Sequence, residues 1–277
     1  MVREDDVVPD MFYHYTSIDA FRSIIESKKM WATRYDQMED RSEVHVGIDS
    51  VVKVVKEHEA GNPSEYKDFL ISGIESYAEG GLEIYVLSLS GDADSPSQWE
   101  AYTPHGGIAI GFDSRKVRNG FLSPTTKLPH LETQLLRCQY IAKDKYSELQ
   151  ALIEDQFFRP NSYSAMFGKQ GQIAQHFFLA TLSVTIYQTI CSIKDRRYEP
   201  ENEWRCVTWN PHSDTHPIRQ RPGKSYIEMA FEPEDYIKEV WISPRGDRIA
   251  SENAVTECRQ MNGLPFAIRS SKVPYSA

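Results

Sequence analysis

The chain has 277 residues and a formal net charge of -9 at pH 7, with 40% hydrophobic and 12% aromatic residues. These values are typical of a globular protein that buries a substantial core, so they exclude a disordered or fibrous chain. The acidic balance argues against broad, nonspecific binding to nucleic acid or acidic membranes, although a local basic groove stays possible.

The cysteines and the apolar runs predict the compartment. Four cysteines are widely spaced and form no CxxC pair, which favours reduced thiols. The acidic segment 1–10 lacks the apolar core of a signal peptide. The most apolar run, 177–191, is short and interrupted by polar residues, so we expect no membrane span and a soluble, cytoplasmic protein.

The first predicted strand, residues 11–17, is rich in aromatic residues that favour β structure. Because side chains alternate along a strand, His14 and Thr16 share one face and Tyr13 and Tyr15 share the other. Imidazole and hydroxyl groups can form hydrogen bonds and a tyrosine ring can stack on a flat ring, so these residue types can contact a ligand. A hydrogen-bonded core histidine is the alternative for His14.

The remaining elements follow in chain order. Ser17 is placed to cap a helix over 18–28, in which apolar residues recur at helical spacing. The pattern then predicts a strand at 30–34, helices at 42–56 and 64–77, a strand at 83–90, a short helix at 97–102 and strands at 106–113 and 134–141. It further predicts helices at 147–158, 163–193 and 252–261, and strands at 201–207, 225–231, 237–242 and 265–271.

Short strands interspersed with helices, without regular β-α-β alternation, predict an α+β fold. No linker or repeat divides the sequence, so we expect one domain over 1–277 with a helical insertion at about 144–193.

The stretch 198–207 (YEPENEWRCV) carries the strongest local chemistry. In an extended strand, Glu201, Glu203 and Arg205 share one face. One acid can then be held ionised by the guanidinium while like charge raises the pKa of the other, which suits general-base work or the binding of a sugar hydroxyl. A solvated edge strand with a Glu–Arg pair is the alternative interpretation.

Three cations, Arg219, Arg221 and Lys224, follow closely in the sequence. This local basic cluster could meet a phosphate-bearing acceptor, or it could be an ordinary charged surface.

Five short stretches follow one another along the chain: Tyr13–Ser17, Met30–Thr33 with Asp36, Ser88–Ser90, Gln98–Trp99 with Tyr102 and Gly106–Asp113, and Glu201–Arg205. Their order and spacing resemble the domain-of-unknown-function 2971 family of bacterial and phage proteins, over about 12–275. The segment 35–40 departs from that family, because a tighter Asn-Asp-Pro turn is expected there.

This family is in turn similar to the ADP-ribosyltransferase fold. His14-x-Thr16 resembles the opening of NAD-using transferases that modify DNA or protein. Ser88-x-Ser90 resembles the Ser-Thr-Ser motif of another branch, and Glu201-x-Glu203 its Glu-x-Glu motif. The resemblance implies an ADP-ribosyltransferase-like split of short strands, with NAD cleaved and ADP-ribose transferred to an unknown macromolecular acceptor, protein or nucleic acid. It also implies a toxin or phage-defence effector, with plain NAD hydrolysis as a variant.

The resemblance also implies roles for the residues. Glu203 would be catalytic, because a carboxylate on the ribose hydroxyls stabilises an oxocarbenium-like transition state. Glu201 would orient or deprotonate the acceptor. Ser88 and Ser90 would hold the carboxylate of Glu203. The expected contacts with NAD are His14, Tyr15, Thr16, Tyr13, Ser88, Ser90 and Arg205, and no metal is implied.

Two other classes of function stay open. One is a catalytically silent module that keeps the fold and binds a nucleotide or a partner. The other is a metal-dependent nuclease whose acids would be Asp36, Glu39, Asp40, Glu201 and Glu203. The sequence has no lysine at a suitable spacing from these acids, which favours the NAD-using enzyme.

Overall fold

A computed structural model of the chain describes residues 7–38, 41–58, 67–68, 70–72, 74–75, 84–120, 133–141, 147, 150–151, 187–209 and 217–274, except for the side chains of 41–46 and 209. Two compact units divide the chain. Unit 1 comprises Met1–Arg34, Ile84–Arg137 and Tyr198–Ala277, and unit 2 comprises Tyr35–Glu83 and Cys138–Arg197.

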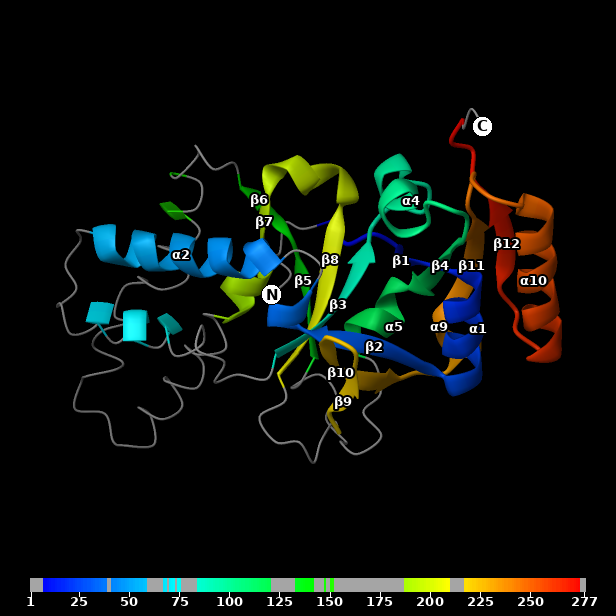
Figure 1. Cartoon of the computed structure of the whole chain (residues 1–277), viewed down its shortest axis with the longest axis horizontal. Helices are drawn as coiled ribbons and strands as arrows, with labels where there is room; N and C mark the ends of the chain where they lie inside the picture. Colours follow the sequence, from blue (N-terminus) through cyan, green and yellow to red (C-terminus); the bar gives the residue numbers. More distant parts are fainter. Residues whose placement is uncertain are drawn as a thin grey trace. The chain divides into compact units, whose positions relative to one another are not determined.

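A mostly antiparallel sheet forms the body of unit 1 (Figure 1). Its strands are β1 (Met11–Thr16), β2 (Lys29–Arg34), β3 (Ile84–Ser90), β4 (Ile108–Asp113), β5 (Thr133–Arg137), β8 (Glu203–Trp209), β9 (Arg219–Arg221), β10 (Lys224–Ala230), β11 (Ile237–Ile242) and β12 (Ala267–Ser270). The main path runs β12-β11-β4-β1-β3-β2-β10-β9, and β8 pairs with β3 and β5. The pairing of β11 with β12 is parallel.

Helices accompany this sheet in unit 1: α1 (Ile18–Ser27), α4 (Pro96–Tyr102), α5 (Ser114–Arg118), α9 (Pro233–Tyr236) and α10 (Arg248–Met261). α1 begins where predicted, because the hydroxyl of Ser17 accepts a hydrogen bond from the backbone N–H of Ala20 at 3.2 Å. Its buried residues Phe21 and Ile25 are four apart and join the main core. That core also holds Phe12 and many apolar residues from the strands, so one face of the sheet is sealed against α1 and α10.

The strand β3 has two different neighbours along one of its edges. Residues 85–86 pair with β2, whereas β1 pairs at Ser90 through Tyr13. Along the other edge, β8 pairs with the whole of β3. β1 and β2 therefore part beside residues 87–89, and we call this place the fork.

The labelled elements of unit 2 include the 3-10 helix η1 (Tyr35–Gln37), α2 (Arg41–Glu57), and the parallel strands β6 (Gln139–Ile141) and β7 (Ile193–Asp195). The hydroxyl of Tyr35 donates to the carbonyl of Ile190 at 3.1 Å. The strand predicted over 134–141 is two strands, β5 in unit 1 and β6 in unit 2.

The α+β prediction is confirmed by these elements, and the ADP-ribosyltransferase-like details stay a prediction. The expected helical insertion at 144–193 falls within unit 2, and most of it lies outside the described residues, as does much of the helix expected at 64–77. Among the described helices, none combines the length and the apolar character needed to cross a bilayer.

Candidate functional site

The register between β3 and β8 brings the predicted acid and serines together. Ser90 pairs with Glu203, and Ser88 pairs with Arg205. Paired residues of an antiparallel ladder point to the same face, so these four side chains share one face of the sheet. The neighbouring Trp204 points to the opposite face and belongs to the main core.

A buried ion pair joins Glu203 to Arg205 within this group. The guanidinium donates from Nε to Oε1 at 2.8 Å and from an Nη to Oε2 at 3.2 Å. The side chain of Arg205 is 0% exposed and that of Glu203 is 6% exposed. The carboxylate is therefore held in a bidentate, charge-assisted pair, which fixes its orientation.

The two serines of β3 differ from each other. The hydroxyl of Ser90 donates to the carbonyl of Glu201 at 2.8 Å and accepts from the backbone N–H of Asp92 at 3.1 Å. The expected hydrogen bond from Ser90 to the carboxylate of Glu203 is therefore wrong. The hydroxyl oxygen of Ser88 is buried and has no hydrogen-bond partner in the described part of the chain. A buried hydroxyl without a partner is costly, and it commonly marks a place that a ligand or water completes.

His14 of β1 contacts β3 through the backbone of Ser88. Because Tyr13 pairs with Ser90, strand alternation directs His14 to the face that carries the main core. Its imidazole nevertheless hydrogen-bonds the backbone of Ser88 at the fork. Burial lowers the pKa of His14 to about 4, against the opposing effect of that hydrogen bond. The imidazole is therefore neutral at pH 7, and it can both donate and accept a hydrogen bond.

The two tyrosines of β1 are packed inside unit 1. The hydroxyl of Tyr13 donates to Glu239 at 2.9 Å, and that of Tyr15 donates to the carbonyl of Asp92 at 2.7 Å. The ring of Tyr15 meets Trp99 of α4 edge-on, with centroids 4.6 Å apart. Burial raises the pKa of both phenols. Tyr13 and Tyr15 are only 7% and 5% exposed, so little ring surface is left for stacking on a ligand.

Thr16, the last residue of β1, is partly buried. It pairs with Ile108 of β4 and lies beyond the single residue through which β1 pairs with β3.

The structure corrects the placement of Glu201. The strand β8 begins at Glu203, and Glu201 ends the preceding 3-10 helix η3 (Arg196–Glu201). Asn202 between them has a φ of 44°, in the left-handed region. Its carbonyl accepts a hydrogen bond from the N–H of Gly91 at 2.8 Å. Glu201 is therefore outside the strand alternation that was expected to put it on the same face as Glu203.

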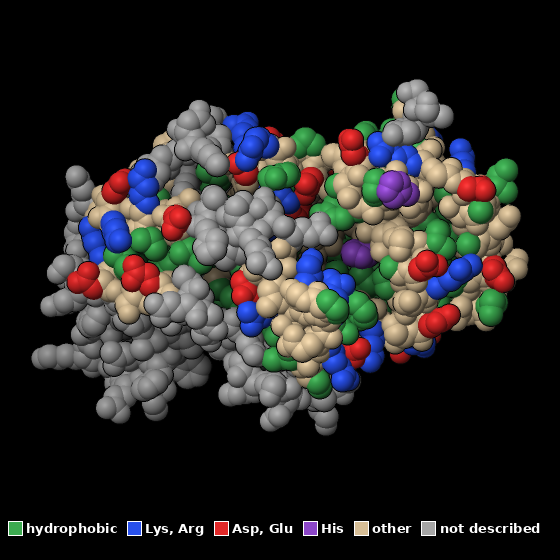
Figure 2. All heavy atoms as spheres, in the orientation of Figure 1, with side chains coloured by type: hydrophobic (Ala, Val, Ile, Leu, Met, Phe, Trp, Pro, Cys, Tyr) green, Lys and Arg blue, Asp and Glu red, His purple; other side chains and the backbone are tan. Residues whose placement is uncertain are grey.

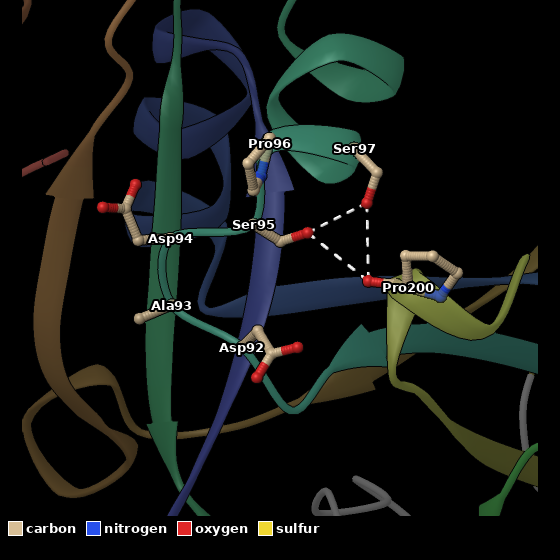
Figure 3. A pocket seen from close by; sticks show the side chains of 7 residues that line it. All are labelled: Asp92, Ala93, Asp94, Ser95, Pro96, Ser97 and Pro200. Carbon is tan, nitrogen blue, oxygen red and sulfur yellow. Dashed lines mark hydrogen bonds between the residues drawn. The ribbon is translucent and has the colours of Figure 1, made fainter. Parts of the chain in front are cut away.

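A pocket that sequence reasoning missed lies just beyond the end of β3 (Figure 3). The hydroxyls of Ser95 and Ser97 are 2.9 Å apart, and both donate weakly to the carbonyl of Pro200, at 3.5 and 3.4 Å. The lining residues are Asp92, Ala93, Asp94, Ser95, Pro96, Ser97 and Pro200. The available signal was the run of Gly, Asp and Ser that follows the strand, which is typical of a loop.

The acids of the metal-nuclease alternative are not brought together by the described structure. Glu39 and Asp40 lie outside the described residues, and Asp36 belongs to unit 2. Within the described ranges, no group of three or more His, Cys, Asp or Glu side chains is arranged to hold a metal ion.

Comparison with known proteins gives a partial match. The model of a family described as protein of unknown function (DUF2971) matches residues 98–206. This range begins in α4 and ends within β8, so it includes Trp99 and the Glu203–Arg205 pair. It supports the family resemblance over this part of the chain. No curated protein and no solved structure matches the chain.

Proposed function

We propose that unit 1 binds NAD at the fork and cleaves the bond between nicotinamide and ribose. The C1′–N bond breaks, nicotinamide leaves with the bonding electrons, and C1′ is captured by an acceptor nucleophile or by water. The transition state has oxocarbenium character, so the site needs a fixed anion and donors for the ribose hydroxyls.

The buried hydroxyl of Ser88 is the observation that carries this proposal. It lies at the fork, without a partner in the described chain, and its strand position is paired with Arg205. A ribose hydroxyl at the fork would satisfy this group. The neutral imidazole of His14 reaches the fork from the opposite face of the sheet, where it hydrogen-bonds the backbone of Ser88, so a ligand that contacts both groups would have to enter between β1 and β2. Two sides of one ligand would thus be held from β1 and β3.

Glu203 supplies the anion in this proposal. The guanidinium of Arg205 fixes both carboxylate oxygens, so the anion needs no reorganisation when positive charge develops on the ribose. β1 and β8 are each one strand away from β3, which places their backbones about 10 Å apart, a span that a nucleotide can bridge. In this proposal the partly exposed Glu201 acts as the general base and accepts the proton of the acceptor nucleophile.

The direct test is the release of nicotinamide from NAD by the purified protein, with and without cell extract as a source of acceptor. We expect release by the wild type and its loss by at least about 100-fold in Glu203→Gln, which keeps the shape but removes the anion. Ser88→Ala should raise KM more than it lowers kcat if the hydroxyl binds the ground-state ribose.

Asp113→Asn is the matched control for Glu203→Gln. Asp113 is also a carboxylate bound by a bidentate arginine two residues later, with distances of 3.1 and 2.8 Å to Arg115. It lies at the end of β4 and is paired with Met11, away from the fork. If nicotinamide release is unchanged in both variants, Glu203 is not the catalytic anion. If the wild type releases no nicotinamide under either condition, the proposal is refuted.

A further inference from the structure

An aromatic pair formed by an exposed tryptophan and a half-buried tyrosine lies on the outer part of the sheet of unit 1. Trp31 of β2 is 47% exposed, and its ring stacks on Tyr226 of β10 with centroids 4.4 Å apart and planes 29° from parallel. The guanidinium carbon of Arg221 lies 5.5 Å from the Trp31 ring centroid. A large exposed tryptophan is unusual for a surface that binds nothing, because burying such a ring is strongly favourable.

Cations surround this pair on the same face. The register puts Arg219 opposite Tyr226 and Arg221 opposite Lys224, so strand alternation directs these side chains to the face that carries Trp31. All of β9 is exposed. We call the group Lys29, Trp31, Arg219, Arg221, Lys224, Tyr226 and Glu228 the aromatic-basic surface, and Figure 2 shows hydrophobic and basic side chains side by side over β9 and β10.

The charge of this surface opposes that of the chain. Glu228 is the one carboxylate in the group, and it is already paired with Lys29 at 2.7 Å and lies 3.9 Å from Arg219. Four cations against one carboxylate leave a local excess of three positive charges, on a protein whose net charge is -9. A local basic area on an acidic protein favours a specific anionic partner over general adhesion.

We propose that the aromatic-basic surface binds single-stranded nucleic acid. Unpaired bases stack on exposed aromatic rings, and their phosphates are neutralised by Arg and Lys beside those rings, which is the combination found here. A duplex keeps its bases stacked inside, so it offers nothing for Trp31. An acidic polypeptide has the charge but lacks flat rings in regular succession.

The surface also adjoins the fork. Thr33, two residues after Trp31, pairs with Val86, and Val86 is two residues before Ser88. Alternation therefore puts Trp31, Thr33, Val86 and Ser88 on one face of the sheet. A nucleic acid bound to the aromatic-basic surface would extend toward the fork, as an acceptor of ADP-ribose would need to do. Its binding does not depend on NAD cleavage.

The test is fluorescence anisotropy of a labelled oligothymidylate of about 12 nucleotides, a length within the range of single-strand sites, with oligouridylate as a second probe. We expect Trp31→Ala to weaken binding by about 5- to 150-fold, which corresponds to the stacking of one base. Trp31→Phe should restore part of this loss, because phenylalanine keeps a ring for stacking.

Salt dependence tests the charges separately. An excess of three cations predicts that log K falls against log salt with a slope of about -2, and Arg219→Gln with Arg221→Gln should reduce the slope by about 1.4. Arg118→Gln with Arg248→Gln is the control, because it removes the same charge from exposed positions on α5 and α10. Its slope should equal that of the wild type.

Three results would overturn the proposal. The first is no binding of either oligonucleotide by the wild type at about 50 mM salt, where electrostatic binding is strong. The second is equal affinity of Trp31→Ala and wild type, with melting temperatures that show both are folded. The third is equally tight binding of polyglutamate of the same length, because it would mean that charge alone is recognised. Nicotinamide release in the arm without cell extract is measured in the absence of any nucleic acid, so either proposal can fail alone.

Discussion

The ion pair between Glu203 and Arg205 offers a quantitative test of how the site is built. We consider Arg205→Met, Glu203→Gln and the double variant. Arg205 is 0% exposed and Glu203 is 6% exposed, so neither charge can turn to solvent when its partner is removed. Each single variant therefore removes the bidentate partner of a buried charge, whereas the double variant removes both charges of the pair.

The expected losses follow from this burial. Removing one partner of a buried pair costs about 3–5 kcal/mol of the free energy of unfolding, and we expect this loss for Arg205→Met. The double variant should be more stable than Arg205→Met, with a coupling near the top of the range of about 0.5–3 kcal/mol for residues in contact. Arg115→Met breaks a pair of similar geometry, but Arg115 is 86% exposed, so its effect should be much smaller.

Urea unfolding followed by tryptophan fluorescence measures these differences. All five tryptophans of the chain, Trp31, Trp99, Trp204, Trp209 and Trp241, lie in unit 1, so the signal reports on the unit that holds the pair. A loss below about 1 kcal/mol for Arg205→Met would be that of a solvated surface pair and would refute the buried geometry. Equal stability of the single and double variants would likewise show that the two charges are not coupled.

Two further predictions concern titratable groups in unit 1. The pKa of His14 is lowered to about 4 from an ordinary 6.5, so the unfolded state binds more protons between these values and stability should fall as the pH falls from about 6.5 to 4. Because His14 keeps some exposure, the loss of stability should be below the roughly 3 kcal/mol of a full shift. In a plot of the urea midpoint against pH, His14→Gln should flatten the part between pH 4 and 6.5. A profile unchanged by this substitution would contradict the lowered pKa of His14. Burial raises the pKa of the Cys206 thiol to about 12, so Cys206 should resist a thiol reagent at pH 8 in the native protein and react once the protein is denatured. Peptide mapping after labelling measures this difference. Rapid labelling of Cys206 in the native protein would contradict its burial.

The strands and capped helices were predictable because their signals are local. Alternation fixed the opposite faces of Ser88 and Leu87, and Ser17 marked the start of α1. The prediction was wrong at Glu201, because strand alternation does not extend to this residue. Glu201 ends a 3-10 helix that contains Pro200, and Asn202, which follows it, has a left-handed backbone conformation. One residue with a positive φ ends the strand, and an asparagine in the sequence is only a weak indicator of a positive φ.

The site depended on pairing that no local pattern reveals. That Ser90 faces Glu203, and Ser88 faces Arg205, follows from the register of β3 with β8, whose residues are over a hundred positions apart. The role expected for Tyr13 and Tyr15 rested on residue type and on the resemblance, and their burial could not be foreseen, because an aromatic strand residue can face either the core or a ligand. The branching of β1 and β2 from β3 is likewise a property of the assembled sheet.

The binding of NAD at the fork can be tested with a crystal structure of Glu203→Gln soaked with NAD. We expect density beside residues 87–89, with a ribose hydroxyl within about 3.2 Å of the Ser88 hydroxyl and within reach of His14. Density for the dinucleotide elsewhere, or an empty fork at saturating NAD, would contradict it.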